Sequence, residues 1–239
     1  MSPAAPDTSA TLAVNELFGP TYQGEGPSQG RLARFVRLYG CHLTCGWCDT
    51  PQTWDRRRHH PTAEQRHIAV ADVLDWLSGV PECLVVITGG EPLLQQRALE
   101  PLLASIMQNS LAGETEVETS GTIAPHPAVV EAVTRFIVSP KLTHSGLPER
   151  HRHRPTALHQ FVQSGKAIWK FVVQSVLDLD EVETLVARYR LDPVWIMPEG
   201  IDSTTVLDRM RLPADPVLAR GWNLTSRLHI MLWENARAR

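Results

Sequence analysis

The feature that most constrains the fold is a repeated alternation of short β-rich segments and amphipathic helical stretches. Runs with β-branched and aromatic residues are typical of strands, and they occur at residues 34–39, 83–88, 116–119, 135–138, 168–173, 194–197 and 228–232. Apolar residues recur at helical spacing at 68–77, 93–111, 128–134, 179–190 and 203–219. Strands that alternate with helices form parallel βα units. Too few units are present for a closed eight-fold barrel, so we expect an α/β fold with a partial, open βα barrel.

Three cysteines form the strongest chemical signal. Cys41, Cys45 and Cys48 are spaced C-x3-C-x2-C directly after the predicted strand at 34–39. Thiolates are the ligands that iron-sulfur clusters and zinc prefer, and a four-iron cluster held by only three of them keeps one iron open for chemistry. A zinc knuckle completed by His42 or a distant residue is the alternative, although no second pair of ligands follows. The fourth cysteine, Cys83, opens a predicted strand and is expected to be a core thiol.

Two further motifs accompany the cysteines. T-G-G-E-P at 88–92, with Trp47 just before the last cysteine, resembles the radical S-adenosylmethionine superfamily. Q-G-E-G at 23–26 and C-D-T at 48–50 resemble, more narrowly, the 7-carboxy-7-deazaguanine synthases. The resemblance runs from Asn15 to near His229 and implies a partial barrel of the radical S-adenosylmethionine type. Residues 227–229 depart from the family pattern, so no site residue is expected there.

The resemblance also implies a role for individual residues. Cys41, Cys45 and Cys48 would hold a [4Fe-4S] cluster, and Thr50 matches a position that contacts Mg²⁺. The pocket for S-adenosylmethionine would comprise Trp47, Cys48, Asp49, Gly90, Glu91, Ser139, Pro140 and Lys141. The substrate would contact Tyr22, Gln23, Gly24, Glu25, Arg37 and Thr88.

The implied activity is that of a radical carbon-nitrogen lyase. A 5'-deoxyadenosyl radical would take a hydrogen from 6-carboxy-5,6,7,8-tetrahydropterin, and ring contraction with loss of ammonia would give 7-carboxy-7-deazaguanine for 7-deazapurine (queuosine-type) biosynthesis. The resemblance further implies a homodimer and a flavodoxin or ferredoxin as electron donor. An enzyme that activates a glycine in a partner protein, and a non-catalytic zinc-binding or nucleic-acid module, are the competing hypotheses.

The residues alone leave several positions open. Arg37 could face the site and hold a carboxylate, or it could belong to an ion-paired strand face. The glycine-rich loop at 23–26 is by itself typical of a surface turn. The arginine- and histidine-rich runs at 56–60 and 149–154 favour solvated loops, and residues 143–165 are expected to form an exposed insertion.

Composition bounds the partners and the compartment. With 23 basic and 26 acidic residues the net charge is −3, so no basic field favours nucleic acid. No apolar run approaches membrane-spanning length, and residues 1–13 lack the basic and apolar blocks of a signal peptide. We therefore expect a cytoplasmic protein with no membrane partner, in which residues 1–13 form a flexible tail and residues 14–239 form one domain.

Overall fold

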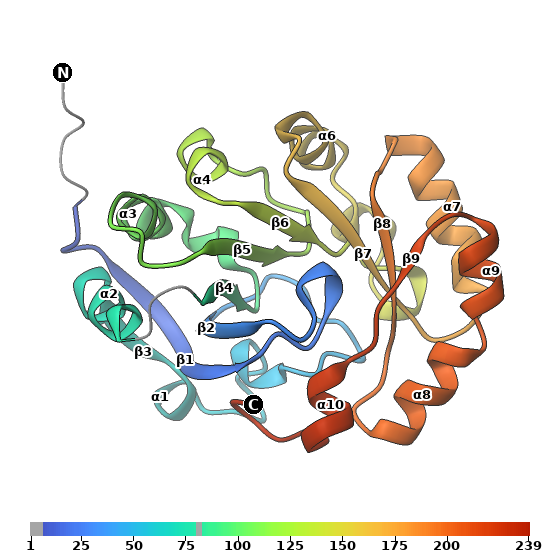
Figure 1. Cartoon of the computed structure of the whole chain (residues 1–239), viewed down its shortest axis with the longest axis horizontal. Helices are drawn as coiled ribbons and strands as arrows, with labels where there is room; N and C mark the ends of the chain where they lie inside the picture. The colour runs from blue at the N-terminus through green and yellow to red at the C-terminus, as the bar shows by residue number, and fades with distance from the viewer. Residues whose placement is uncertain (1–6, 80–82) are drawn as a thin grey trace.

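The computed structural model describes residues 7–79 and 83–239. The strands in these ranges form a single open sheet in the order β3-β1-β2-β4-β5-β6-β7-β8-β9 (Figure 1). β1 pairs antiparallel with β2 and β3, whereas every ladder from β2 onward to β9 is parallel. The strands are β1 Thr11–Tyr22, β2 Leu32–Leu38, β3 Arg66–Ala69, β4 Leu84–Gly89, β5 Glu114–Thr119, β6 Arg135–Val138, β7 Ala167–Val173, β8 Val194–Pro198 and β9 Asn223–Leu224. The predicted open, mostly parallel α/β architecture is confirmed.

Helices cover the outer face of this sheet (Figure 1). The longer helices are α2 Val70–Ser78, α3 Gln96–Gln108, α4 Pro127–Ala132, α6 Pro155–Ser164, α7 Asp178–Tyr189, α8 Ser203–Arg211 and α9 Ala214–Ala219. Shorter helical turns are η1 Gly26–Ser28, η2 Pro51–Thr53, α1 Pro61–Glu64, η3 Pro92–Gln95, η4 Thr143–Ser145, α5 Glu149–Arg152 and α10 Leu228–Trp233. None of the helices in the described ranges is long and apolar enough to cross a membrane.

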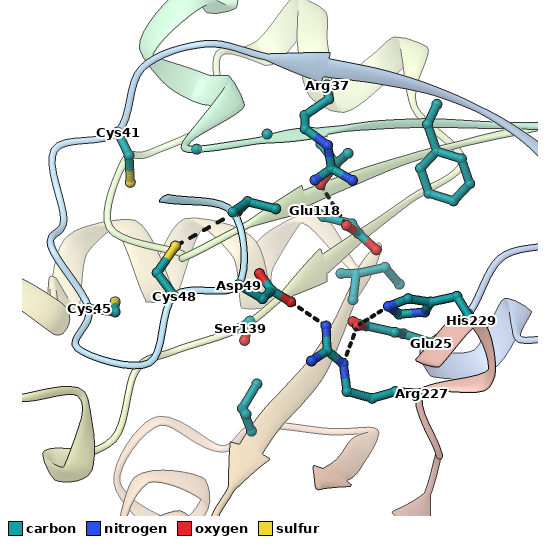
Figure 2. Close-up of a pocket in the computed structure, with 18 of the residues that line it drawn as sticks. Glu25, Arg37, Cys41, Cys45, Cys48, Asp49, Glu118, Ser139, Arg227 and His229 are labelled. Carbon is teal, nitrogen blue, oxygen red and sulfur yellow. Dashed lines mark hydrogen bonds and ion pairs between the residues drawn. The ribbon is translucent and has the colours of Figure 1, made fainter. Parts of the chain in front are cut away.

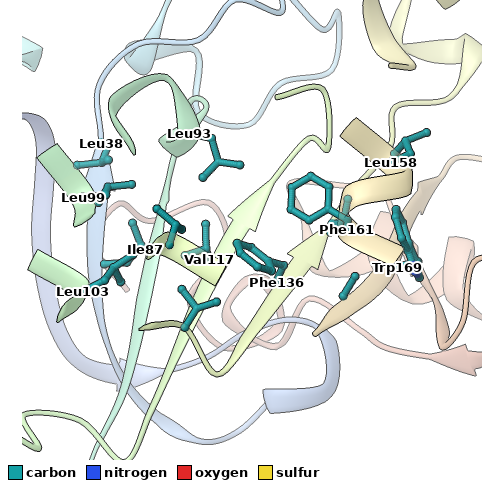
Figure 3. Close-up of a cluster of buried hydrophobic side chains, with 14 of the residues drawn as sticks. Leu38, Ile87, Leu93, Leu99, Leu103, Val117, Phe136, Leu158, Phe161 and Trp169 are labelled. Carbon is teal, nitrogen blue, oxygen red and sulfur yellow. The ribbon is translucent and has the colours of Figure 1, made fainter. Parts of the chain in front are cut away.

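The core lies between the sheet and these outer helices (Figure 3). Ile87, Val117, Phe136 and Trp169 point outward from β4 to β7 and are almost completely buried. Phe136 meets Phe161 of α6 edge to face, with ring centroids 5.1 Å apart. Because successive side chains of a strand point to opposite faces, the positions between these apolar residues face the inner side of the sheet.

The inner face of the sheet is polar at its carboxyl end. Alternation places Arg37 of β2, Thr88 of β4, Glu118 of β5 and Lys170 of β7 on this face. All four side chains line one cavity. The apolar outer residues thus fix which strand residues face the site.

The amino-terminal boundary differs from the prediction. Residues 1–6 lie outside the described part, but β1 already begins at Thr11, so residues 11–13 are not part of a tail. Leu12 is completely buried in the core, and Thr11 and Leu12 pair with Ala69 and Ile68 of β3. The short apolar run at 11–14 is therefore part of a strand that lies between β3 and β2. β3 also takes Ile68 from the predicted helix, which begins at Val70.

Two predictions in the carboxyl-terminal half were wrong. Residues 228–232 form helix α10 instead of a strand, because the sheet ends at β9 and only Ile230 of this segment is buried. Residues 143–165 are not an exposed insertion, since α6 packs against β7 and α7. Leu158 and Phe161 of α6 belong to the core, and Arg152 and His153 are buried.

Phe161 distinguishes a packed helix from an exposed insertion. We expect Phe161→Ala to lower the free energy of unfolding by about 3 kcal/mol or more, because it removes a fully buried aromatic ring. Denaturant unfolding followed by circular dichroism would measure it. Gln163→Ala, at an exposed position of the same helix, should change this free energy by less than about 0.5 kcal/mol. Equal small effects of both substitutions would contradict the packing of α6.

Candidate active site

The cysteine loop is held at the carboxyl end of the sheet by backbone contacts. The Gly40 amide donates to the carbonyl oxygen of Thr53 at 2.8 Å, and the Glu91 amide donates to that of Gly40 at 2.8 Å. Gly90 packs directly against the start of the cysteine loop. A Cβ added to it would be 2.3 Å from the Gly40 carbonyl oxygen and 2.7 Å from the Cys41 Cβ. The second glycine of T-G-G-E-P is therefore required for the end of β4 to pack on the cysteine loop.

The three cysteines of the loop line one cavity, and two of their sulfurs accept hydrogen bonds. The Trp54 indole nitrogen donates to Cys48 Sγ at 3.3 Å, and the Leu43 amide donates to Cys41 Sγ at 3.4 Å. Burial raises the pKa of the Cys41 thiol to about 12, and it also raises that of Cys45, so thiolates form here when metal cations displace the protons. Residues 7–79 and 83–239 contain no group of three His, Cys, Asp or Glu side chains that could hold a single metal ion. Cys41, Cys45 and Cys48 nevertheless all line one cavity.

Glu91 is buried next to the cavity but does not line it. Its carboxylate is fully buried and accepts hydrogen bonds from Thr119 Oγ1 at 2.7 Å and from the Ser120 amide at 2.9 Å. Ser120 Oγ also bonds Thr122 Oγ1 at 2.8 Å, and Thr122 Oγ1 lies 2.7 Å from His42 Nε2 in the cysteine loop. Glu91 therefore braces β4, β5 and the cysteine loop, and it does not face the cavity as the sequence-based prediction required.

One cavity joins the cysteine loop to most of the other predicted residues (Figure 2). Its lining includes the predicted residues Tyr22, Gln23, Gly24, Glu25, Arg37, Cys41, Cys45, Trp47, Cys48, Asp49, Thr50, Thr88, Gly90, Ser139 and Lys141. Pro140 and Glu91 are buried and do not line it. Parts of the chain as distant as residues 22 and 141 thus meet in one place.

A network of charged side chains crosses the cavity below the cysteines (Figure 2). Glu25 pairs with Lys170 and accepts from Arg227 Nε at 3.0 Å, while Arg227 also pairs with Asp49. Burial alone would raise the pKa of Glu25, but Lys170 and Arg227 outweigh it and lower that pKa. Burial alone would lower the pKa of Lys170, and Glu25 and Glu118 raise it instead. These groups therefore remain charged, and the network holds Asp49 beside the cysteine loop.

Glu118 extends this network along the inner face of the sheet. It accepts from Thr88 Oγ1 at 2.7 Å and from Gln23 Nε2 at 3.2 Å. Lys170 Nζ lies 4.0 Å from its carboxylate. The cavity therefore offers a row of amide, hydroxyl, carboxylate and ammonium groups, which suits the hydrogen-bonding edge of a planar, nitrogen-rich ring.

Arg37 combines both roles that the sequence left open. Its Nε donates to Glu16 at 3.1 Å, so it belongs to an ion pair. It also lines the cavity, where its guanidinium lies 5.3 Å from the ring centroid of Phe18. Glu16 in turn accepts from Arg237 at 2.8 Å, and Arg237 also bonds Glu64 at 2.9 Å. The carboxyl-terminal residues 235–239 thereby form part of the cavity lining.

Several of these residues were missed from the sequence. Lys170 could have been found from strand alternation, because it lies between the outward-facing Trp169 and Phe171. The signal for Glu118 is weaker, since only Val117 beside it is apolar. Arg227 and His229 were missed because residues 227–229 depart from the family pattern, so that no site residue was expected there. His229 fits only because Gly24 has no side chain, since an added Cβ there would be 1.9 Å from His229 Nδ1. Nothing in the sequence signals that contact across 205 positions.

Comparison with known proteins agrees with this geometry. Residues 22–138 match the family described as a 4Fe-4S single cluster domain. The 7-carboxy-7-deazaguanine synthase of Pyrobaculum aerophilum is 36% identical over 231 residues, covering 95% of this chain and 97% of that protein. The corresponding enzyme of Escherichia coli K12 is 32% identical over 237 residues, covering 90% and 96%. The crystal structure of QueE from Escherichia coli superimposes with a TM-score of 0.70 at 30% identity, covering 92% of this chain and 95% of that one.

The open barrel and the three-cysteine loop define an enzyme of the radical S-adenosylmethionine class. The sequence identities to these enzymes, over nearly the full length of both chains, define the family more narrowly. The chain belongs to the 7-carboxy-7-deazaguanine synthase family.

Gly90 provides a test of how the cysteine loop is held. We expect Gly90→Ala to destabilise the protein by about 1–3 kcal/mol, because the new methyl group would overlap backbone atoms that cannot move aside. The variant should also bind less iron per chain after anaerobic reconstitution. Gly46→Ala, within the loop itself, is the control, since its Cβ would meet only the Ser145 carbonyl oxygen at 3.8 Å. Full iron uptake by Gly90→Ala would show that this close contact is dispensable.

The Glu25–Lys170 pair should stabilise the fold equally from about pH 5.5 to pH 9. The pKa of Glu25 lies below its ordinary 4.5, so its contribution is complete above that pH and is lost in stronger acid. The pKa of Lys170 lies above its ordinary 10.5, so its contribution is complete below that pH and is lost in stronger alkali. A double-mutant cycle of Glu25→Gln and Lys170→Met, measured by denaturant unfolding at both pH values, should give one coupling energy. A coupling energy that differs between them would rule out an ion pair with these pKa shifts.

Proposed function

We propose that this enzyme converts 6-carboxy-5,6,7,8-tetrahydropterin to 7-carboxy-7-deazaguanine with release of ammonia, as a radical lyase of 7-deazapurine (queuosine-type) biosynthesis. The observation that carries the proposal is the shared cavity, in which three thiols face a row of side chains suited to a polar ring. Neither the three thiols nor the row of polar side chains is by itself specific for this reaction. Together they support radical chemistry on a small, nitrogen-rich substrate.

Cys41, Cys45 and Cys48 are proposed to hold the [4Fe-4S] cluster. The chemistry supplied by the cluster with S-adenosylmethionine is the formation of a 5'-deoxyadenosyl radical, which removes a hydrogen atom from the substrate. Lys141 is proposed to bind the carboxylate of S-adenosylmethionine, and its ammonium lies 5.3 Å from the Trp47 ring centroid. Around it, Trp47, Cys48, Asp49, Gly90 and Ser139 are proposed to line this subsite. Glu91 and Pro140 shape it from behind.

We assign binding of the pterin to the row of polar side chains that includes Gln23, Thr88, Glu118 and Lys170. Gln23, Glu25 and Thr88 are proposed to orient the ring edge, with Tyr22 and Gly24 beside it. The buried charges around Glu25 are fixed before any ligand enters, so little reorganisation is needed when the substrate binds. Arg37 is proposed to exchange part of its ion pair with Glu16 for the substrate carboxylate, which a guanidinium can bind through two parallel hydrogen bonds.

Thr50 is proposed to contact Mg²⁺. Its side chain lines the cavity, and its carbonyl oxygen accepts from the Thr53 amide at 3.0 Å and from Thr53 Oγ1 at 2.8 Å. These bonds fix the Thr50 backbone, while its hydroxyl oxygen lies 3.7 Å from Cys48 Sγ. Mg²⁺ keeps several water ligands and needs few protein groups, so one hydroxyl with substrate oxygens and water suits it.

The remaining partners are proposals of the same kind. We propose a homodimer, a reduced flavodoxin or ferredoxin as the electron donor, the reducing cytoplasm as the compartment, and residues 14–239 as one catalytic domain. The exposed apolar side chains of Leu212 and Leu218, 66% and 76% accessible, support an association surface. Light scattering after size exclusion would measure the dimer directly.

The assay that tests this function uses protein purified without oxygen and reconstituted with iron and sulfide. Incubation with S-adenosylmethionine, Mg²⁺, dithionite and 6-carboxy-5,6,7,8-tetrahydropterin should give 7-carboxy-7-deazaguanine by mass spectrometry. Cys45→Ala should give none, because it removes one of the three thiols of the loop.

Other outcomes would redirect the assignment. Formation of 5'-deoxyadenosine without the deazaguanine product would point to another radical enzyme, such as one acting on a protein glycine. A colourless protein that retains zinc and makes neither product would refute the cluster itself.

A further inference from the structure

Two adjacent residues of the basic run at 149–154 are buried, whereas the neighbouring Arg150, His151 and Arg154 are exposed. Arg152 is 7% accessible and His153 is 5% accessible. We propose that Arg152 and His153 are positioning residues that hold the loop 139–146, and with it Lys141, against the cysteine loop so that the S-adenosylmethionine subsite is formed before the cofactor arrives. This inference rests on the proposed use of that subsite.

Both residues reach the same backbone atom. Arg152 Nη1 donates to the carbonyl oxygen of Lys141 at 3.0 Å, and His153 Nε2 lies 2.9 Å from that oxygen. Arg152 Nη2 also donates to Thr143 Oγ1 at 2.9 Å. Neither Arg152 nor His153 lines the cavity. Their effect on the site therefore passes through the backbone of Lys141.

Arg152 is itself anchored to a long helix. Its Nη1 lies 2.5 Å from Glu181 Oε1, and Glu181 belongs to α7. Glu181 also accepts from the Thr143 amide at 2.8 Å. Burial alone would raise the pKa of Glu181, but the Thr143 amide and Arg152 outweigh it and lower that pKa, so the carboxylate stays charged. One carboxylate of α7 thus fixes both Arg152 and the loop that Arg152 holds.

The opposite side of the loop 139–146 touches the cysteine loop. The Gly46 amide donates to the carbonyl oxygen of Ser145 at 3.0 Å. The centroids of the Trp47 and His144 rings lie 5.5 Å apart. The Lys141 ammonium lies 5.3 Å from the centroid of the Trp47 ring. The loop is therefore clamped between Arg152 and His153 on one side and residues between the cluster ligands on the other.

The position of Lys141 matters because its charge is available. Lys170 pairs with Glu25 and Glu118, and Arg227 pairs with Glu25 and Asp49. Arg37 pairs with Glu16. In the part of the chain that the structure describes, no carboxylate lies within ion-pair distance of Lys141, whose ammonium bonds only Ser139 Oγ at 3.3 Å. An anionic group that binds beside Cys45 would contact the Lys141 ammonium. If the loop 139–146 were displaced, Lys141 would move away and that group would bind more weakly.

Conservative substitutions can show whether Arg152 and His153 position Lys141 or only contribute to folding. Arg152→Lys keeps a buried cation beside Glu181, but a single ammonium cannot reproduce the planar fork that spans Lys141 and Thr143. Arg150→Lys makes the same change at an exposed position two residues away and is the matched control. His153→Leu removes the donor to the Lys141 carbonyl oxygen at nearly constant volume, whereas His153→Gln can restore a donor near the Nε2 position.

The measurement is a titration of each reconstituted, dithionite-reduced protein with S-adenosylmethionine, followed by the change in the cluster EPR spectrum. We expect Arg152→Lys and His153→Leu to raise the half-saturating concentration about fivefold, the size expected for one lost hydrogen bond. Arg150→Lys and His153→Gln should remain within about twofold of the wild type by the same reasoning. The KM for S-adenosylmethionine should rise in parallel, with kcat and the KM for the pterin nearly unchanged.

The outcomes distinguish this inference from the assignment of function. If the wild type makes 7-carboxy-7-deazaguanine but Arg152→Lys and His153→Leu titrate like Arg150→Lys, the function stands and the clamp is wrong. If Arg152→Lys fails to fold, His153→Leu decides alone, since it introduces no buried charge. If the wild-type spectrum does not respond to S-adenosylmethionine, the subsite and the clamp are both refuted.

Discussion

The structure depends on the close contact between the end of β4 and the start of the cysteine loop. Gly90 approaches the Gly40 carbonyl oxygen so closely that no side chain fits between them. The adjoining Glu91 then uses its buried carboxylate to tie this junction to Thr119 and Ser120 after β5. A radical reaction requires its reacting atoms to be held in fixed positions. Backbone contact and a fully satisfied carboxylate provide that rigidity more firmly than exposed side chains.

The outer face of the sheet is apolar and the inner face is polar at its carboxyl end, and this division explains how the rest of the site assembles. Trp169 and Phe171 anchor β7 in the core on the helix side, which forces Lys170 to the inner face. A buried lysine is costly unless it is paired, and Glu25 meets that requirement from a loop 145 residues earlier. The same pairing places Glu25 where a ring could bind. Core packing and substrate recognition are therefore linked through one ion pair.

The sequence could predict the parts of this site that depend on local pattern. The cysteine spacing and the parallel βα units were read correctly because each depends on residues close together in the chain. Gly90 was predicted as part of the S-adenosylmethionine pocket, whereas its close packing on Gly40 and Cys41 was not predicted. Arg227 and His229 were missed because residues 227–229 depart from the family pattern, and the apolar run at 228–232 does not by itself distinguish a strand from a helix. Their pairing with Glu25 joins residues 202 and 204 positions apart, which no local pattern records.

The basic run at 149–154 shows the same limit in sharper form. Five of its six residues are Arg or His, and such a run usually lies in solvent. One carbonyl oxygen and Glu181 accept hydrogen bonds from Arg152 and His153, which offsets part of the cost of removing them from water. Arg152 Nε and His153 Nδ1 are buried without a hydrogen-bond partner in the described part of the chain. Composition describes the average of a run, whereas burial is decided residue by residue by available partners. A charged run beside a catalytic loop can therefore contain both solvated residues and residues that hold the loop in place.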